Sequence, residues 1–136
     1  MTTNILDDSV FTAEDLHSLV GLFRARISYV MKTITDIRKE YTSAHRHAPE
    51  ELSPVMIRAQ EDFAELLKLS DICWKAREGE IELKEAVGHA GVVFDELFLY
   101  YDWLREVQIA NFSIARVEFD IVEEIRETFR VGRQKV

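Results

Sequence analysis

The chain has 136 residues but only one cysteine, two prolines and five glycines, so cross-linking and chain-breaking residues are scarce. The lone Cys73 cannot form an internal disulfide, and a single cysteine is typical of proteins from a reducing compartment. The few glycines and prolines leave little room for long loops or low-complexity linkers. We therefore expect one domain over residues 1–136, large enough to bury roughly two-thirds of its unfolded surface.

Long apolar runs are also lacking, and no run approaches the length of about eighteen residues that suggests a transmembrane helix. The opening MTTNILDDSV has neither the basic nor the apolar region of a signal peptide. Together with the lone cysteine, these features predict a cytoplasmic protein without a membrane span.

Positive charge is in short supply, because 17 basic residues face 25 acidic ones and the net charge is −8. The excess of acid is concentrated in residues 50–124, which hold 18 acidic and 7 basic residues. Residues 22–49 have the opposite balance, with six basic and two acidic residues, as expected for a basic first helix packed beside acidic neighbours. The chain as a whole would repel phosphates, so nucleic acid is not an expected partner.

Helical periodicity is what the sequence does contain, and the first segment shows it most clearly. Thr12 and Asp15 have the spacing of a capping box, which marks the start of a helix. An apolar seam follows in alternating steps of four and three residues, and it predicts a helix over residues 12–44 that packs nearly parallel or antiparallel to its neighbours. The seam consists of Leu16, Val20, Phe23, Ile27, Val30, Ile34, Ile37 and Tyr41.

A second helix is predicted over residues 54–77, between two breaks in the pattern. Pro49 should end helical geometry before it, and Ser53 followed by Pro54 has the pattern of an N-cap and first helical residue. Gly79 follows the helix at the position where glycine is the usual C-cap residue.

The third segment, from residue 80 to about residue 130, can form one long helix, with heptad spacing from Leu83 to Leu104 and a shifted phase beyond it. One helix of that length would extend about 75 Å, roughly twice the length of its partners. We therefore expect that it breaks near Gly88 and Gly91, or that its far end packs on another chain. The predicted fold is all-α, an antiparallel up-and-down bundle of three long helices, or of four if the break occurs.

Residues 92–122 are unusually apolar for a helix at the surface of a small bundle. They comprise twenty apolar and eleven polar residues, seven of the total being aromatic. On a helical wheel, charged residues such as Asp95 and Asp102 gather in one strip expected to face water, and most of the remaining circumference is apolar. Burial by other helices of the same chain would explain the apolar arc, and so would an interface with another subunit.

The second explanation predicts a non-enzymatic interaction or assembly subunit that needs no cofactor and binds either itself or a protein partner. The long third helix would supply the interface, since its apolar arc is wider than two partner helices usually cover. The predicted interface residues are Phe98, Leu99, Trp103, Ile109, Phe112 and Phe119.

Two acidic clusters suggest an alternative, enzymatic function. Glu61-Asp62-Phe63-Ala64-Glu65 followed by Glu82-Leu83-Lys84-Glu85 resembles the E-E-x-x-E and E-x-x-D motifs of MazG-type all-α nucleoside triphosphate pyrophosphohydrolases. The resemblance implies that carboxylates on two facing helices hold Mg²⁺, which clamps the phosphates and activates water. Two of the five positions, Asp62 and Glu85, depart from the family pattern. Under this alternative, the metal ligands would be Glu61, Asp62, Glu65, Glu82 and Glu85.

Overall fold

The computed structural model describes residues 10–106 and 119–136, and the side chains of residues 105, 106, 119 and 120 fall outside this description. In the described ranges the chain forms helices and no strands. None of these helices has both the length and the apolar character needed to cross a membrane. The four helices are α1 (Ala13–Ser43), α2 (Leu52–Arg77), α3 (Leu83–Glu106) and α4 (Phe119–Lys135).

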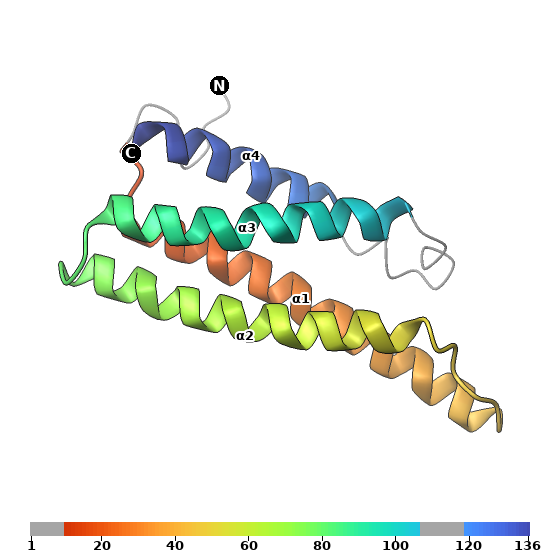
Figure 1. The fold of residues 1–136 in the computed structure, drawn as a ribbon. Helices are drawn as coiled ribbons and strands as arrows, with labels where there is room; N and C mark the ends of the chain where they lie inside the picture. The colour runs from red at the N-terminus through yellow and green to blue at the C-terminus, as the bar shows by residue number, and fades with distance from the viewer. Residues whose placement is uncertain (1–9, 107–118) are drawn as a thin grey trace.

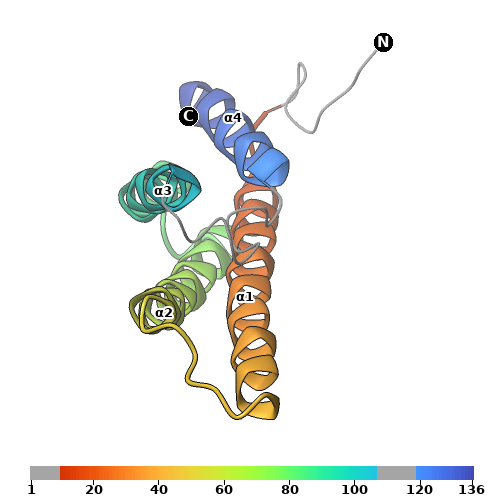
Figure 2. The same cartoon turned by 90° about the vertical axis from the view of Figure 1, so that its right-hand side faces the viewer.

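Consecutive helices run in opposite directions, as Figure 1 shows. Each packs against the next one in the chain, and α4 returns to contact α1, so that the four helices form a closed bundle (Figure 2). The longer hairpin of α1 and α2 extends beyond α3 and α4 at the end that holds the α1–α2 loop (Figure 1). The prediction of an all-α antiparallel bundle is confirmed, in its four-helix form.

Helix α1 begins where its capping residues predict. The Asp15 amide donates to the Thr12 hydroxyl at 3.1 Å, and the Thr12 amide donates to the Asp15 carboxylate at 2.9 Å. This reciprocal pair satisfies two backbone donors that a helix start otherwise leaves unpaired. The apolar seam from Leu16 to Ile34 is buried, and Ile37 packs against its edge, so the heptad spacing identified the inward face correctly.

The start of α2 differs from the prediction, whereas its end agrees. The helix begins at Leu52 rather than Pro54, and Ser53 therefore lies inside its first turn. The Ser53 hydroxyl accepts a hydrogen bond from Arg38 Nη2 at 3.2 Å, which ties α2 to α1. Gly79 adopts φ 78°, in the left-handed region that favours glycine, so its predicted role at the end of α2 is confirmed.

The predicted position of the break in the third helix is wrong. Helix α3 continues through Gly88 and Gly91 as far as Glu106, and the next described helix begins at Phe119. Helix α4 lies antiparallel beside α3 (Figure 1), which rules out a continuous helix over residues 80–130. The apolar arc of α3 therefore gains cover from α4 that a three-helix bundle would not have supplied.

Gly91 has a packing role in place of the expected helix-breaking one. A Cβ atom at this position would lie 2.8 Å from Arg133 Nη2 of α4, too close for a non-bonded contact. The space left by the missing side chain admits the Arg133 guanidinium, which lies 5.6 Å from the Phe129 ring centroid and 3.4 Å from Asp95 Oδ2. A glycine inside a helix costs only about 1 kcal/mol relative to alanine, a loss that this contact between helices helps to offset.

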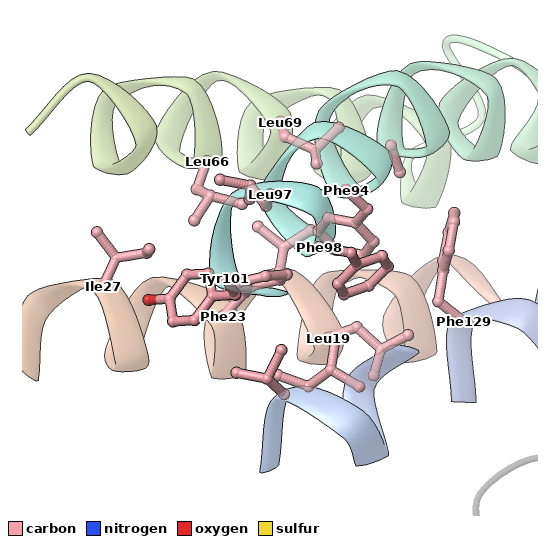
Figure 3. Packing of buried hydrophobic residues seen from close by; sticks show 14 of the residues in the cluster. Leu19, Phe23, Ile27, Leu66, Leu69, Phe94, Leu97, Phe98, Tyr101 and Phe129 are labelled. Atoms are coloured by element: carbon pink, nitrogen blue, oxygen red, sulfur yellow. The ribbon is translucent and has the colours of Figure 1, made fainter. Parts of the chain in front are cut away.

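The core is centred on aromatic side chains from α1, α3 and α4 (Figure 3). The Phe23 ring centroid lies 5.5 Å from those of Phe94 and Phe98 and 5.6 Å from that of Tyr101. Phe94 in turn contacts Phe129 edge to face at 4.8 Å. Three aromatic side chains of α3, Phe94, Phe98 and Tyr101, are therefore buried in the chain's own core. The outward face of the helix lies away from this core.

We expect Gly132→Ala to lower the free energy of unfolding by about 1–2 kcal/mol. Its Cβ would lie 2.5–2.9 Å from atoms of the Phe11 ring, which is fully buried. The overpacking should exceed the helix-propensity gain of about 1 kcal/mol. Urea denaturation measures the change.

The matched control is Gly88→Ala, because a Cβ at Gly88 has no atom within 4 Å. This variant should be up to about 1 kcal/mol more stable than the native protein, since alanine favours a helix. Equal stabilisation by both substitutions would contradict the position of Phe11 against α4.

Candidate functional site

Three exposed apolar side chains lie in a line on the outward face of α3. Val92, Leu99 and Trp103 are 68%, 71% and 50% exposed. Their separations of seven and four residues place them on one side of the helix over about 16 Å. We name these three residues the α3 stripe. Single exposed apolar residues are ordinary on protein surfaces, whereas an aligned set of this kind is typical of interaction sites.

The indole of Trp103 is held in place by a series of contacts that begins on α2. It stacks on the Tyr100 ring with a centroid distance of 5.4 Å and an interplanar angle of 30°. The Arg58 guanidinium lies 4.5 Å from the Tyr100 centroid, and Arg58 Nε is 2.9 Å from both carboxylate oxygens of Asp62. A half-exposed aromatic ring that is already oriented loses little conformational entropy when a partner covers it.

Acidic side chains accompany the α3 stripe. Glu96 is exposed and lies within the stripe's own helical register, and Glu61 is exposed on α2. Burial raises the pKa of Asp62, the Arg58 guanidinium opposes this, and the negative charges of Glu61 and Glu96 raise the pKa further. Both glutamates thus lie close enough to act on Asp62.

A groove of about 420 Å³ between α3 and α4 borders the other side of the stripe. Two ion pairs cross it, between Arg126 and Asp102 at 2.8 Å and between Arg133 and Asp95 at 3.4 Å. The Arg126 guanidinium also lies 5.0 Å from the Phe98 ring centroid. The strip of charges predicted to face water therefore contacts α4 in part. These interactions join α3 to α4. The side chains of the α3 stripe remain exposed beside them.

The structure separates the residues predicted to form an interface. Phe98 is only 8% exposed, stacks on Phe23 at 5.5 Å and is covered by Arg126 of α4, so it is part of the chain's own core. Leu99 and Trp103 are exposed on the outward face of α3, where a partner can reach them. The remaining predicted positions lie outside the described residues: Ile109, Phe112 and the side chain of Phe119.

Three contributors to this face were missed by the sequence interpretation. Val92 stands one heptad before Leu99, so helical spacing alone would have identified it. Tyr100 and Arg58 meet across two helices, and no local pattern in the sequence signals that contact.

The acidic residues of the pyrophosphohydrolase hypothesis are not brought together. The first cluster lies in the middle of α2, and the second lies at the start of α3. From Glu65 to Arg77 the helix continues for about 18 Å before the chain turns into α3. The part of the chain that the structure describes contains no group of three or more His, Cys, Asp or Glu placed to hold a metal ion. The separated clusters are Glu61, Asp62 and Glu65 on one side, and Glu82 and Glu85 on the other.

We expect the free energy of unfolding of the Asp62→Asn variant, relative to that of the native protein, to increase as the pH rises. Burial raises the pKa of Asp62 above its ordinary value of 3.8, so the folded chain binds this proton more tightly than the unfolded chain. Stability therefore falls as the pH rises through the interval between those two pKa values. The variant lacks that loss, which urea denaturation from about pH 4 to about pH 7 would reveal. Asp71→Asn, the same substitution at an exposed position of α2, is the control, and a pH-independent difference for Asp62→Asn would contradict the expectation.

Cys73 is a packing residue beside a pocket of about 360 Å³ that His17 and Trp74 also line. The thiol is 1% exposed, and burial raises its pKa to about 11, so it stays protonated near neutral pH. We expect iodoacetamide to alkylate Cys73 in the folded protein at least about 100-fold more slowly than in urea. Mass spectrometry follows the reaction, and equal rates would show that the pocket opens readily.

Comparisons with protein-family models, curated proteins and solved structures give no match to this chain. Its function must therefore be inferred from its own surface. The outward face of α3 combines an apolar line, an oriented indole and nearby carboxylates.

Proposed function

We propose that this protein is a non-enzymatic helical subunit that binds another polypeptide through the outward face of α3. The α3 stripe is the observation that supports the proposal. Burial of each large apolar side chain contributes roughly 1.5–3 kcal/mol, so contact with the stripe offers a sizeable driving force. Tryptophan is enriched among the residues that dominate binding energy, and Trp103 lies at one end of the stripe.

The rest of the bundle suits this role because it packs against the buried face of α3, opposite the stripe. Phe94 and Tyr101 are on the buried face of the same helix and contact Phe23 of α1. A surface carried by such a packed helix changes little on binding, which favours association. The lone, buried Cys73 fits the cytoplasmic setting that we propose.

Photo-crosslinking in cells that produce the full chain tests the proposal. A benzophenone amino acid at position 99 or 103 should form discrete adducts with a polypeptide. The same group at Leu22, an exposed residue of α1, is the matched control and should give few adducts. Mass spectrometry of the adducts distinguishes a second copy from a different protein. Stripe positions that crosslink no more than position 22 would overturn the proposal.

A further inference from the structure

Glu96 determines what a partner on this face must provide. It lies four residues after Val92 and three before Leu99, so it shares the exposed side of α3 with the stripe. A partner that covers Leu99 and Trp103 therefore also takes Glu96 out of water. A carboxylate buried without a counter-charge is strongly unfavourable, so the partner must supply a cation or several hydrogen-bond donors.

The charge nearby points to a cation. Among the described residues, no ion pair involves Glu96 or Glu61. Glu61 lies one helical turn after Arg58, whose guanidinium is 4.5 Å from the Tyr100 ring centroid and already pairs with Asp62 at 2.9 Å. Two negative charges thus remain without a counter-charge at one edge of the stripe. Electrostatic complementarity selects a positively charged partner at such a surface.

A second copy of the chain does not meet this requirement. In a symmetric dimer the same face would lie opposite itself, which brings Glu96 of each copy towards the other. Helix α3 has five acidic residues, Glu85, Asp95, Glu96, Asp102 and Glu106, against two basic ones, Lys84 and Arg105, so self-pairing concentrates negative charge. Like charges placed together in an interface oppose binding.

The form of the stripe suggests a helix as the element that covers it. Its three side chains make a straight ridge along α3, and a helical partner packs such a ridge into the groove between its own side-chain rows. An amphipathic helix buries its apolar face against a partner through residues spaced three and four apart. Lysine or arginine residues beside that apolar face would reach the carboxylates at the edge of the stripe.

We infer that the α3 stripe binds a basic amphipathic helix of a different protein, whose cations pair with Glu96 and Glu61 while its apolar face covers Leu99 and Trp103. This inference rests on the proposed function and adds the chemistry of the partner. The α3 face then acts as a charge-selective docking surface.

Two synthetic peptides of about eighteen residues test the inference with the full chain. Both have leucine along one face of a helix, and the flanking positions are lysine in the first peptide and glutamate in the second. Fluorescence anisotropy of the labelled peptides measures affinity. The lysine peptide should bind, and the glutamate peptide should bind at least about 100-fold more weakly.

Because the whole chain is acidic, a matched charge control is needed. The double variant Glu61→Lys with Glu96→Lys should weaken binding of the lysine peptide at least about tenfold. Glu40→Lys with Glu50→Lys makes the same change in net charge near the α1–α2 loop and should alter affinity less than about twofold. Equal losses in the two double variants would overturn the inference, since only general attraction would then remain.

The crosslinking experiment distinguishes this failure from failure of the proposed function. Adducts from positions 99 and 103 with a protein that lacks a basic helix would overturn the charge inference and keep the proposed function. Adducts with a second copy of the chain would have the same effect. If the stripe positions form no adduct at all, both the proposed function and the inference about the partner's charge are overturned.

Discussion

Phe23→Ala should lower the free energy of unfolding by about 3–5 kcal/mol, one of the largest effects expected of any single substitution in this chain. The ring is fully buried and contacts Phe94, Phe98 and Tyr101 of α3, with centroids 5.5–5.6 Å away. Its removal leaves a cavity between α1 and α3 that the surrounding aromatic rings can fill only in part. Since small domains are stable by about 5–15 kcal/mol, this loss is a large share of the total.

Tyr29→Ala is the control for this substitution, because Tyr29 is an aromatic residue of the same helix and is 48% exposed. It should cost much less, about 1 kcal/mol at most. Urea denaturation followed by circular dichroism compares the two variants. Similar losses would contradict the central position of Phe23 in the core.

Leu99→Asp should weaken binding of the lysine peptide about 100-fold, which corresponds to about 2.7 kcal/mol. The substitution removes an apolar contact and places a second carboxylate beside Glu96, at the centre of the proposed interface. The stability of the unbound chain should change by about 0.5 kcal/mol or less, because Leu99 is 71% exposed. Strong loss of binding with unchanged folding is the pattern expected of an interface residue.

Leu22→Asp makes the same substitution at an exposed leucine of α1, so it is the matched control. It adds an equal negative charge away from the α3 stripe and should leave peptide affinity within about twofold of the native value. If both aspartate variants bind the peptide as well as the native chain does, the α3 face is not the binding surface.

The local signals in the sequence predicted most of the fold. The capping pair Thr12 and Asp15, the buried seam of α1 and the left-handed Gly79 are all found as expected. Each of these features depends on residues close together in the chain, so their spacing and backbone preferences predict it without knowledge of tertiary contacts. The same reasoning misplaced the start of α2, which begins at Leu52, and the Ser53 hydroxyl accepts a hydrogen bond from Arg38 of α1.

The division of the third helix could not be predicted from local signals. The glycines that suggested a break, Gly88 and Gly91, lie inside α3, where Gly91 makes room for Arg133 of α4. No proline or glycine occurs from residue 92 to residue 131 to mark the boundary actually used. The placement of α4 beside α3 depends on contacts between distant residues, such as Phe94 with Phe129.

The candidate site, too, could be predicted only as far as it depends on local sequence. The apolar character of α3 was evident, and Leu99 and Trp103 were identified as candidates for exposed contact. Which aromatic residues are enclosed depends on α4, which covers Phe98 and leaves Leu99 and Trp103 exposed. The contacts that orient Trp103 run through Tyr100 and Arg58, which are far apart in the sequence.

Emission from Trp103 tests most directly whether a partner packs on the outward face of α3. Trp74 is the other tryptophan, so a Trp74→Phe variant reports on Trp103 alone. Titration of this variant with the tryptophan-free lysine peptide should shift the emission to shorter wavelength, because the half-exposed indole leaves water. Binding of the peptide with no change in Trp103 emission would contradict the assignment of this face as the protein-binding surface.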